Sequence, residues 1–263
     1  MIRQIKDILS KRQLILTLAI SDFKKRFIGS YLGIFWIFMQ PIVSIIIYYF
    51  VFQIGFKSNP VENMPYVLWL MPGIIPWFFF NDTLQSGVST LFSYKHLVKK
   101  MVFRIDILPL IKVVSSLFIH LVFIFILMLV FLIFGEKPSI WWLQAIYYLI
   151  GNTLFVTGLV YITSAINVFV KDVNQIVGIC LQFGFWLAPI MWDMSRMPEE
   201  IHWILRLNPF TYIVDGFRDC FVYHVGFWTK PYMALYFWIF TLVIFMGGVK
   251  LFKKMEPHFA DVL

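Results

Sequence analysis

The chain has 263 residues, of which 60% are hydrophobic, 20% are aromatic and only 14% are charged. Soluble domains contain roughly 45–50% apolar and 25% charged residues, so this composition excludes a soluble protein and indicates an integral membrane protein. The net charge of +8 does not indicate nucleic-acid binding. The basic residues gather at the edges of apolar runs, where they act as topology signals.

The N-terminal segment, residues 1–30, mixes basic and apolar residues at helix-compatible spacing. We expect an amphipathic helix that lies along the inner membrane surface and turns its basic side chains toward anionic lipid headgroups. A plain topology signal followed by a packed helix is the alternative interpretation. The segment has no compact apolar core followed by a small-residue cleavage site, so we do not expect a removed signal peptide.

A bilayer span needs roughly 20 mostly apolar residues, and six stretches of the chain satisfy this requirement. We therefore predict an all-α membrane protein whose 263 residues form a single transmembrane domain. The predicted spans are residues 31–56, 64–92, 107–134, 141–170, 173–192 and 231–252. With six spans both termini lie on one side, and placing them in the cytoplasm puts most of the 22 Lys and Arg residues inside, as the positive-inside rule requires.

Two segments outside the spans have distinctive patterns. In residues 93–106, apolar positions alternate with basic ones, which predicts a short cytoplasmic helix suited to docking on another protein; a plain basic loop would explain the charge but not the apolar face. Residues 193–230 contain two helix starts, at Pro198 before two glutamates and at Asn208 before Pro209. This predicts an extracytoplasmic hairpin of two short amphipathic helices that lies at the membrane edge or dips into the membrane and back, with an Asp215–Arg218 pair on its second helix.

Motifs for chemistry are missing from the sequence. It contains no phosphate-binding Gly-x-x-x-x-Gly-Lys loop and no His-Glu-x-x-His pair, so we expect no catalytic residue, metal site or bound cofactor in this chain. Asp82 is the one acidic or basic residue well inside a predicted span. Burying it in lipid is costly, so we expect Asp82 to face a partner helix or a cavity. One acid does not make a proton relay.

Four stretches of sequence resemble the membrane subunits of type-2 ABC exporters, in the branch that exports polysaccharides and polyol phosphates. They are residues 22–36 (Asp-Phe-Lys-Lys-Arg-Phe-Ile-Gly-Ser-Tyr-Leu-Gly-Ile-Phe-Trp) with Gln40-Pro41, 99–109 (Lys-Lys-Met-Val-Phe-Arg-Ile-Asp-Ile-Leu-Pro), 208–218 (Asn-Pro-Phe-Thr-Tyr-Ile-Val-Asp-Gly-Phe-Arg) and 257–263 (Pro-His-Phe-Ala-Asp-Val-Leu). Teichoic acid, O-antigen and capsule exporters share these marks, and the resemblance covers essentially the whole chain.

The resemblance implies an assembly in the cytoplasmic membrane. Two copies of the chain would form a channel above two copies of a separate ABC ATPase, which would bind the ATP and Mg²⁺. The cargo would be a glycan linked to undecaprenyl diphosphate. Alternatives are a membrane enzyme or an ion-coupled flippase acting on polyprenyl-linked glycans, and the sequence does not identify the polymer.

The resemblance also implies roles for individual residues. The residues placed at the substrate gate and headgroup site are Lys24, Lys25, Arg26, Tyr31 and Trp36. Those placed along the channel are Phe35, Asp82, Phe183 and Trp186. Those placed in contact with the ATPase are Lys95, Leu97, Val98, Lys99, Lys100, Met101 and Arg104, with Lys171 and Asp172 as a second, smaller contact.

Overall fold

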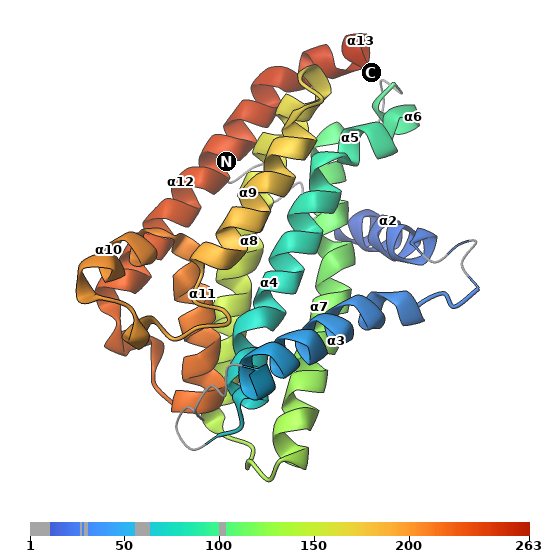
Figure 1. Ribbon diagram of the computed structural model, residues 1–263. Helices are drawn as coiled ribbons and strands as arrows, with labels where there is room; N and C mark the ends of the chain where they lie inside the picture. The colour runs from blue at the N-terminus through green and yellow to red at the C-terminus, as the bar shows by residue number, and fades with distance from the viewer. Residues whose placement is uncertain (1–10, 27, 29–30, 56–63, 100–103) are drawn as a thin grey trace.

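The computed structural model describes residues 11–26, 28, 31–55, 64–99 and 104–263, and the regular elements in these ranges are helices (Figure 1). The long helices are α3 (Phe35–Tyr48), which continues as a π-helical segment (Tyr49–Gly55), α4 (Tyr66–Val88), α7 (Leu108–Ile133), α8 (Ala145–Phe169), α9 (Val173–Leu187) and α12 (Pro231–Met255). The shorter helices are α2 (Arg12–Lys25), α5 (Thr90–Ser93), α6 (Lys95–Val98), α10 (Glu199–Leu207), α11 (Pro209–Arg218) and α13 (Phe259–Val262). Short 3-10 or π-helical turns cover Ile105–Ile107, Ile140–Gln144, Met194–Arg196, Asp219–Tyr223, Phe227–Thr229 and Glu256–His258.

Within the described residues, five helical segments are long and apolar enough to cross a membrane, which supports a multi-pass membrane protein. They are Phe35–Gly55, Tyr66–Val88, Ile105–Ile133, Ile140–Phe169 and Pro231–Val262. The predicted span 173–192 is shorter than expected, because α9 has 15 residues, or about 22 Å at the helical rise. A hydrocarbon core is about 30 Å thick, so α9 alone does not match it. The helix ends where Ala188 takes an extended conformation (φ −80°, ψ 139°).

The elements that were predicted to be cytoplasmic lie together at one end of the bundle. In Figure 1, α5, α6, the turn between α8 and α9, and the C-terminal helix α13 occupy the upper end. A second apolar core joins them there, with Tyr94, Val98 and Phe259 among its buried members. The α10–α11 hairpin lies away from that end, at the left of the bundle in this view.

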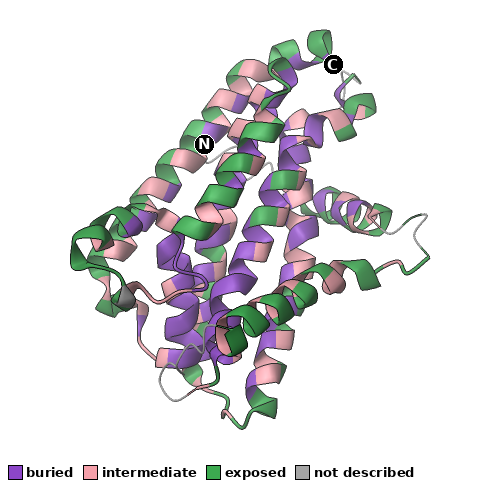
Figure 2. Ribbon diagram, viewed as in Figure 1, coloured by how far each residue is buried: buried purple, intermediate pink, exposed green. Residues whose placement is uncertain are grey.

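Helix α4 is the centre of the main core. Most of its length is buried between α7, α8, α9 and α11 (Figure 2), and Trp77 and Phe80 pack on Phe210 of the hairpin with ring centroids 4.9 and 5.0 Å apart. The helix contains Pro72 and Pro76. The side-chain amide of Asn152 on α8 donates to the Pro76 carbonyl at 3.1 Å, which satisfies a buried polar group in the apolar core.

The hairpin begins its two helices where the sequence predicts. Helix α10 starts after Pro198, and α11 starts after Asn208, whose side chain accepts a hydrogen bond from the Phe210 N–H at 3.0 Å. The two helices differ in burial: α10 is largely exposed, whereas α11 is almost entirely buried against α4, α8 and α12. The second helix is therefore part of the core rather than a loop at the membrane edge.

The predicted Asp215–Arg218 pair is wrong. The Arg218 side chain is 3% exposed, and its hydrogen bonds go to backbone carbonyls and not to the Asp215 carboxylate. Its guanidinium donates to the carbonyls of Pro189 and Ile190, each at 2.6 Å, and stacks 3.5 Å from the ring of Trp69. A delocalised guanidinium can satisfy several carbonyls at once, so Arg218 ties the non-helical segment after α9 to α4 and α11.

The predicted coupling helix, residues 93–106, is not one continuous helix in its described part. Helix α6 covers only Lys95–Val98. Tyr94, directly before it, has backbone angles outside the helical range (φ −110°, ψ 24°), and Arg104 is extended. Residues 100–103 lie outside the described residues, and so do residues 1–10 of the predicted N-terminal helix. The described part of that helix, α2, lies across the bundle in Figure 1 and buries Ile15, Ala19 and Asp22.

Candidate functional site

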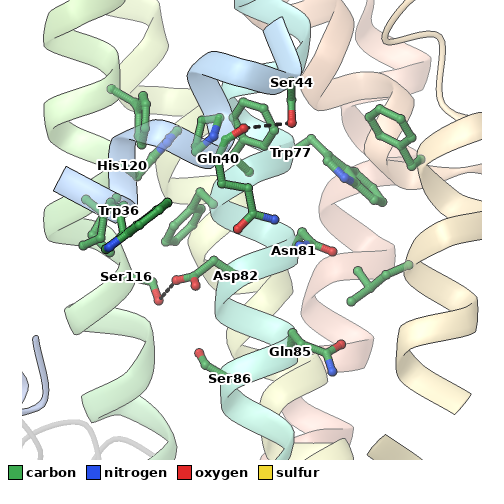
Figure 3. Close-up of a pocket in the computed structure, with 18 of the residues that line it drawn as sticks. Trp36, Gln40, Ser44, Trp77, Asn81, Asp82, Gln85, Ser86, Ser116 and His120 are labelled. Atoms are coloured by element: carbon green, nitrogen blue, oxygen red, sulfur yellow. Dashed lines mark hydrogen bonds between the residues drawn. The ribbon is translucent and has the colours of Figure 1, made fainter. Parts of the chain in front are cut away.

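A cavity of about 790 Å³ lies between α3, α4, α7 and α9 (Figure 3). Each helix lends one face to it, since the lining positions recur at helical spacing. On α3 these positions are Trp36, Gln40, Ser44 and Tyr48, four residues apart; on α9 they are Gly178, Leu181, Gln182 and Phe185. Residues at this spacing lie above one another on a helix. The cavity therefore follows about three turns of α3, roughly 18 Å.

The lining of the cavity is unusually polar for the interior of a membrane bundle. Amide side chains come from Gln40, Asn81, Gln85 and Gln182, and aromatic faces come from residues that include Trp36 and Trp77. Polar groups at membrane depth are costly and mark the routes of substrates or ions. An aromatic wall with a few polar groups is the usual composition of a ligand pocket.

The only Asp, Glu, Lys or Arg side chains among the described lining residues are Arg26 and Asp82, and they form an ion pair. The Arg26 Nη1 donates to the Asp82 Oδ2 at 2.9 Å, and the Arg26 Nη2 donates to the Ser116 hydroxyl at 3.0 Å. Ser116 donates in turn to the same Asp82 oxygen at 2.5 Å (Figure 3). These hydrogen bonds link Asp82 on α4 and Ser116 on α7 to Arg26, which directly follows α2.

A second polar cluster lies next to the first, around the buried carboxylate of Asp22 on α2. Tyr94 donates to the Asp22 Oδ1 at 2.8 Å and Lys112 donates to it at 2.6 Å, while the Arg26 Nε lies 3.9 Å from Oδ2. Burial raises the pKa of the Asp22 carboxyl, but the hydrogen bond and charge of Lys112 outweigh it and leave the pKa below its ordinary value. Asp22 and Arg26 thus connect the segment before α6 with the cavity.

The predicted gate and channel residues fall into two groups. Arg26, Trp36 and Asp82 line the cavity. Lys24 and Lys25 are exposed at the end of α2, and Tyr31, Phe35, Phe183 and Trp186 are exposed on the outside of the single chain. On α9 it is Phe185, between the two predicted aromatics, that faces the cavity.

The predicted ATPase contacts are likewise divided. Lys95, Lys99, Lys171 and Asp172 are exposed, and Leu97 is half-buried. Val98 is only 2% exposed and packs in the second core, so it supports the fold of this subunit instead of facing a partner. Arg104 pairs with Asp106 at 2.5 Å. Lys100 and Met101 lie outside the described residues.

Reasoning from the sequence missed the amides that line the cavity and the hydroxyl of Ser116. A signal was present for α3 and α9, because Gln40 and Gln182 are polar residues within apolar runs. His120 also lines the cavity, is 2% exposed, and stacks on Phe79 with ring centroids 4.8 Å apart.

Comparison with known proteins identifies the family. The model of the ABC-2 type transporter family matches residues 13–222, which contain every helix described above from α3 to α11. The chain is a member of the ABC-2 type transporter family.

Curated relatives of this ABC-2 type transporter match it over nearly their whole length. It is 26% identical over 251 residues to the O-antigen export system permease protein RfbA of Klebsiella pneumoniae, covering 95% of each chain. A protein of the same name from Myxococcus xanthus is 27% identical over 266 residues, covering 99% of each. The family membership agrees with the resemblance described above, and the cavity lies within the part of the transporter that the family model covers.

Proposed function

We propose that this chain is the membrane subunit of an ATP-driven exporter. Its cargo is a lipid-linked polysaccharide or wall teichoic acid, moved from the cytoplasmic to the outer side of the plasma membrane. The observation that carries the proposal is the polar and aromatic cavity between α3, α4, α7 and α9 in a member of a transporter family. The names of the relatives, O-antigen export permeases, support a glycan as the cargo.

The ends of the cavity fit a lipid-linked glycan. Lys24 and Lys25 are exposed where α2 ends, so they are free to meet the diphosphate of an undecaprenyl carrier at the inner membrane surface. Arg26 forms an ion pair with Asp82, so we assign the diphosphate contact to the two lysines and not to Arg26. The diphosphate therefore stays near the lysines while the glycan enters the cavity.

A second copy of the chain completes the channel in this proposal. None of the residues of Phe35–Gly55 is buried, although the segment is strongly apolar. Phe183 and Trp186 on α9 are exposed as well. Contact between two copies through α3 and α9 would bring these aromatics to a shared path across the membrane.

The exporter draws its energy from two copies of a cytoplasmic ABC ATPase, which hold the ATP and Mg²⁺. Exposed Lys95 and Lys99 on and after α6, with Lys171 and Asp172 at the turn before α9, form the proposed docking surface. Movement of α6 reaches the cavity through Tyr94, which bonds Asp22 on α2. In the ion-coupled alternative Asp82 would have to bind the cation, but its charge is already neutralised by Arg26.

The docking surface gives a direct test of the proposal. Replacing Lys95 and Lys99 together by Glu reverses two exposed charges without touching the core, so the chain should insert normally and lose copurification with its ATPase. The matched control is Lys137→Glu, an exposed lysine in the loop before α8. Normal ATPase recovery with the double variant would contradict this docking surface. A chain that never copurifies with an ATPase from native membranes would contradict the proposed function itself.

A further inference from the structure

The charge inside the cavity limits which polymer it can hold. Arg26 and Asp82 carry the only formal Lys, Arg, Asp or Glu charges among the described lining residues, and they neutralise each other at 2.9 Å. A polymer with one phosphate in every repeat would bring a series of negative charges into this space. Its stabilisation would require cationic side chains free to pair with the phosphates.

The charge of Arg26 is already paired with carboxylates of the protein. Its Nη1 bonds Asp82, its Nη2 bonds Ser116, and its Nε faces the Asp22 carboxylate at 3.9 Å. The Arg26 side chain is 20% exposed, against 44% for Asp82. The acid, not the base, is therefore the more accessible member of the pair.

Asp82 keeps an acceptor that faces no protein donor. Both of its hydrogen bonds end on Oδ2, and Oδ1 accepts none from the described residues. A carboxylate oxygen accepts readily from hydroxyl groups. The same oxygen repels a phosphate, because like charges placed together in an enclosed site are unfavourable.

The groups around Asp82 also fit hydroxyl groups. The amides of Gln40, Asn81, Gln85 and Gln182 line the same cavity, and each amide can donate and accept hydrogen bonds, as each sugar hydroxyl can. Trp36 and Trp77 add flat apolar faces of the kind that amphipathic rings can pack against.

We propose that the cavity binds an uncharged, hydroxyl-rich stretch of the exported glycan and disfavours a phosphodiester backbone. Asp82 and the four amides hold the sugar hydroxyls, and the charge of Arg26 is already paired with Asp82, so it does not compensate a phosphate. The cargo is then a neutral polysaccharide and not a teichoic acid. This inference rests on the proposed function and narrows it to one class of polymer.

The test compares two defined cargoes in the complete transporter, the chain with its ATPase in proteoliposomes. One cargo is an oligomer of uncharged hexoses and the other is an oligomer of glycerol phosphate of equal length, both joined to undecaprenyl diphosphate. Transfer to the far face is followed by digestion with an added glycosidase or phosphodiesterase. We expect the glycerol phosphate oligomer to be exported roughly tenfold more slowly, because of charge repulsion in the cavity.

A pair of variants at one position assigns the selectivity to the cavity. Gln182→Lys places a free ammonium in the lining and should raise export of the glycerol phosphate oligomer relative to the hexose oligomer. Gln182→Glu has a similar size and the opposite charge, and it should widen the difference. ATP hydrolysis by the complex and its recovery from membranes verify that both variants fold.

Each outcome separates the inference from the proposed function on which it rests. Equal export of the two oligomers, faster export of glycerol phosphate, or the same ratio in both folded Gln182 variants would overturn the inference and leave the exporter intact. Export of neither oligomer by a complex that hydrolyses ATP would overturn the proposed function as well.

Discussion

Arg26 and Asp82 lie 56 residues apart in the sequence, yet the structure joins them in one ion pair at the wall of the cavity. Each was singled out from the sequence for its own reason, Asp82 as an acid within an apolar run and Arg26 as part of a basic cluster. Asp82 was expected to face a partner helix or a cavity. It lines the cavity and also accepts a hydrogen bond from Ser116 on α7. Its actual partner was not predictable, since periodicity does not specify which helices pack together.

A double-mutant cycle measures this pair. Arg26→Gln and Asp82→Asn should each destabilise the chain, and their combination should cost less than the sum because the lost interaction is shared. The pair is partly exposed, so we expect a coupling free energy of about 1 kcal/mol. Unfolding of the purified chain in detergent provides the free energies. Strict additivity of the two substitutions would show that the pair does not hold α2 to α4.

Asp22 predicts a dependence on pH. Because its pKa is lowered in the folded chain, its ionised form stabilises the fold at neutral pH, and this stabilisation is lost as the pH falls below the ordinary value of 3.8 through the folded pKa. Asp22→Asn should be less stable than the wild type at pH 7 and should lose this part of the acid dependence. Unfolding midpoints between pH 7 and about pH 2, a range that extends below the ordinary pKa, check the prediction. Parallel curves for the two proteins would contradict it.

For the individual helices, sequence patterns predicted where a helix begins but not which other helices it packs against. The starts of α10 and α11 follow from a proline and an Asn cap, which are local signals. The burial of α11 depends on α4 and α8, which no local signal encodes. The same limit explains Val98, which the family resemblance placed in contact with the ATPase but which packs in this chain's own second core.

Arg218 holds the hairpin in place, and its geometry makes a specific prediction. Arg218→Lys keeps the charge but loses the fork that binds the Pro189 and Ile190 carbonyls. We expect a loss of about 2 kcal/mol or more in the free energy of unfolding, because hydrogen bonds from a charged donor are lost in a buried place. Arg206→Lys on the exposed face of α10 is the control and should be near neutral. Equal effects of the two substitutions on the free energy of unfolding would show that Arg218 does not hold the hairpin in place.

Helices α8 and α12 pack closely because of two glycines. A Cβ atom added at Gly248 would lie 2.4 Å from the Gly158 carbonyl oxygen, whereas one added at the adjacent Gly247 meets nothing within 4 Å. Gly248→Ala should therefore destabilise the chain by about 1–3 kcal/mol through overpacking. Gly247→Ala should be neutral or slightly stabilising, because Ala favours helix over Gly. Similar unfolding midpoints for both variants would contradict this packing.

At the scale of the whole molecule, composition established the class of protein and apolar run length placed most of its helices. Helix α9 departed from that expectation: its apolar run continues beyond Leu187, but the helix ends there and the following carbonyls are bound by Arg218. The family resemblance, carried by four stretches in a fixed order, is confirmed by the match of the family model to residues 13–222. The cavity itself was not predicted, because it depends on how four helices face one another.

We propose that this chain exports a lipid-linked glycan with energy from a partner ATPase. The most direct measurement is transfer of an undecaprenyl diphosphate-linked hexose oligomer across proteoliposomes that contain both subunits, with and without ATP. We expect transfer to require ATP and to stop when the ATPase carries a substitution in its own nucleotide site. Transfer that continues without ATP, or with the inactive ATPase, would contradict it and favour the ion-coupled alternative.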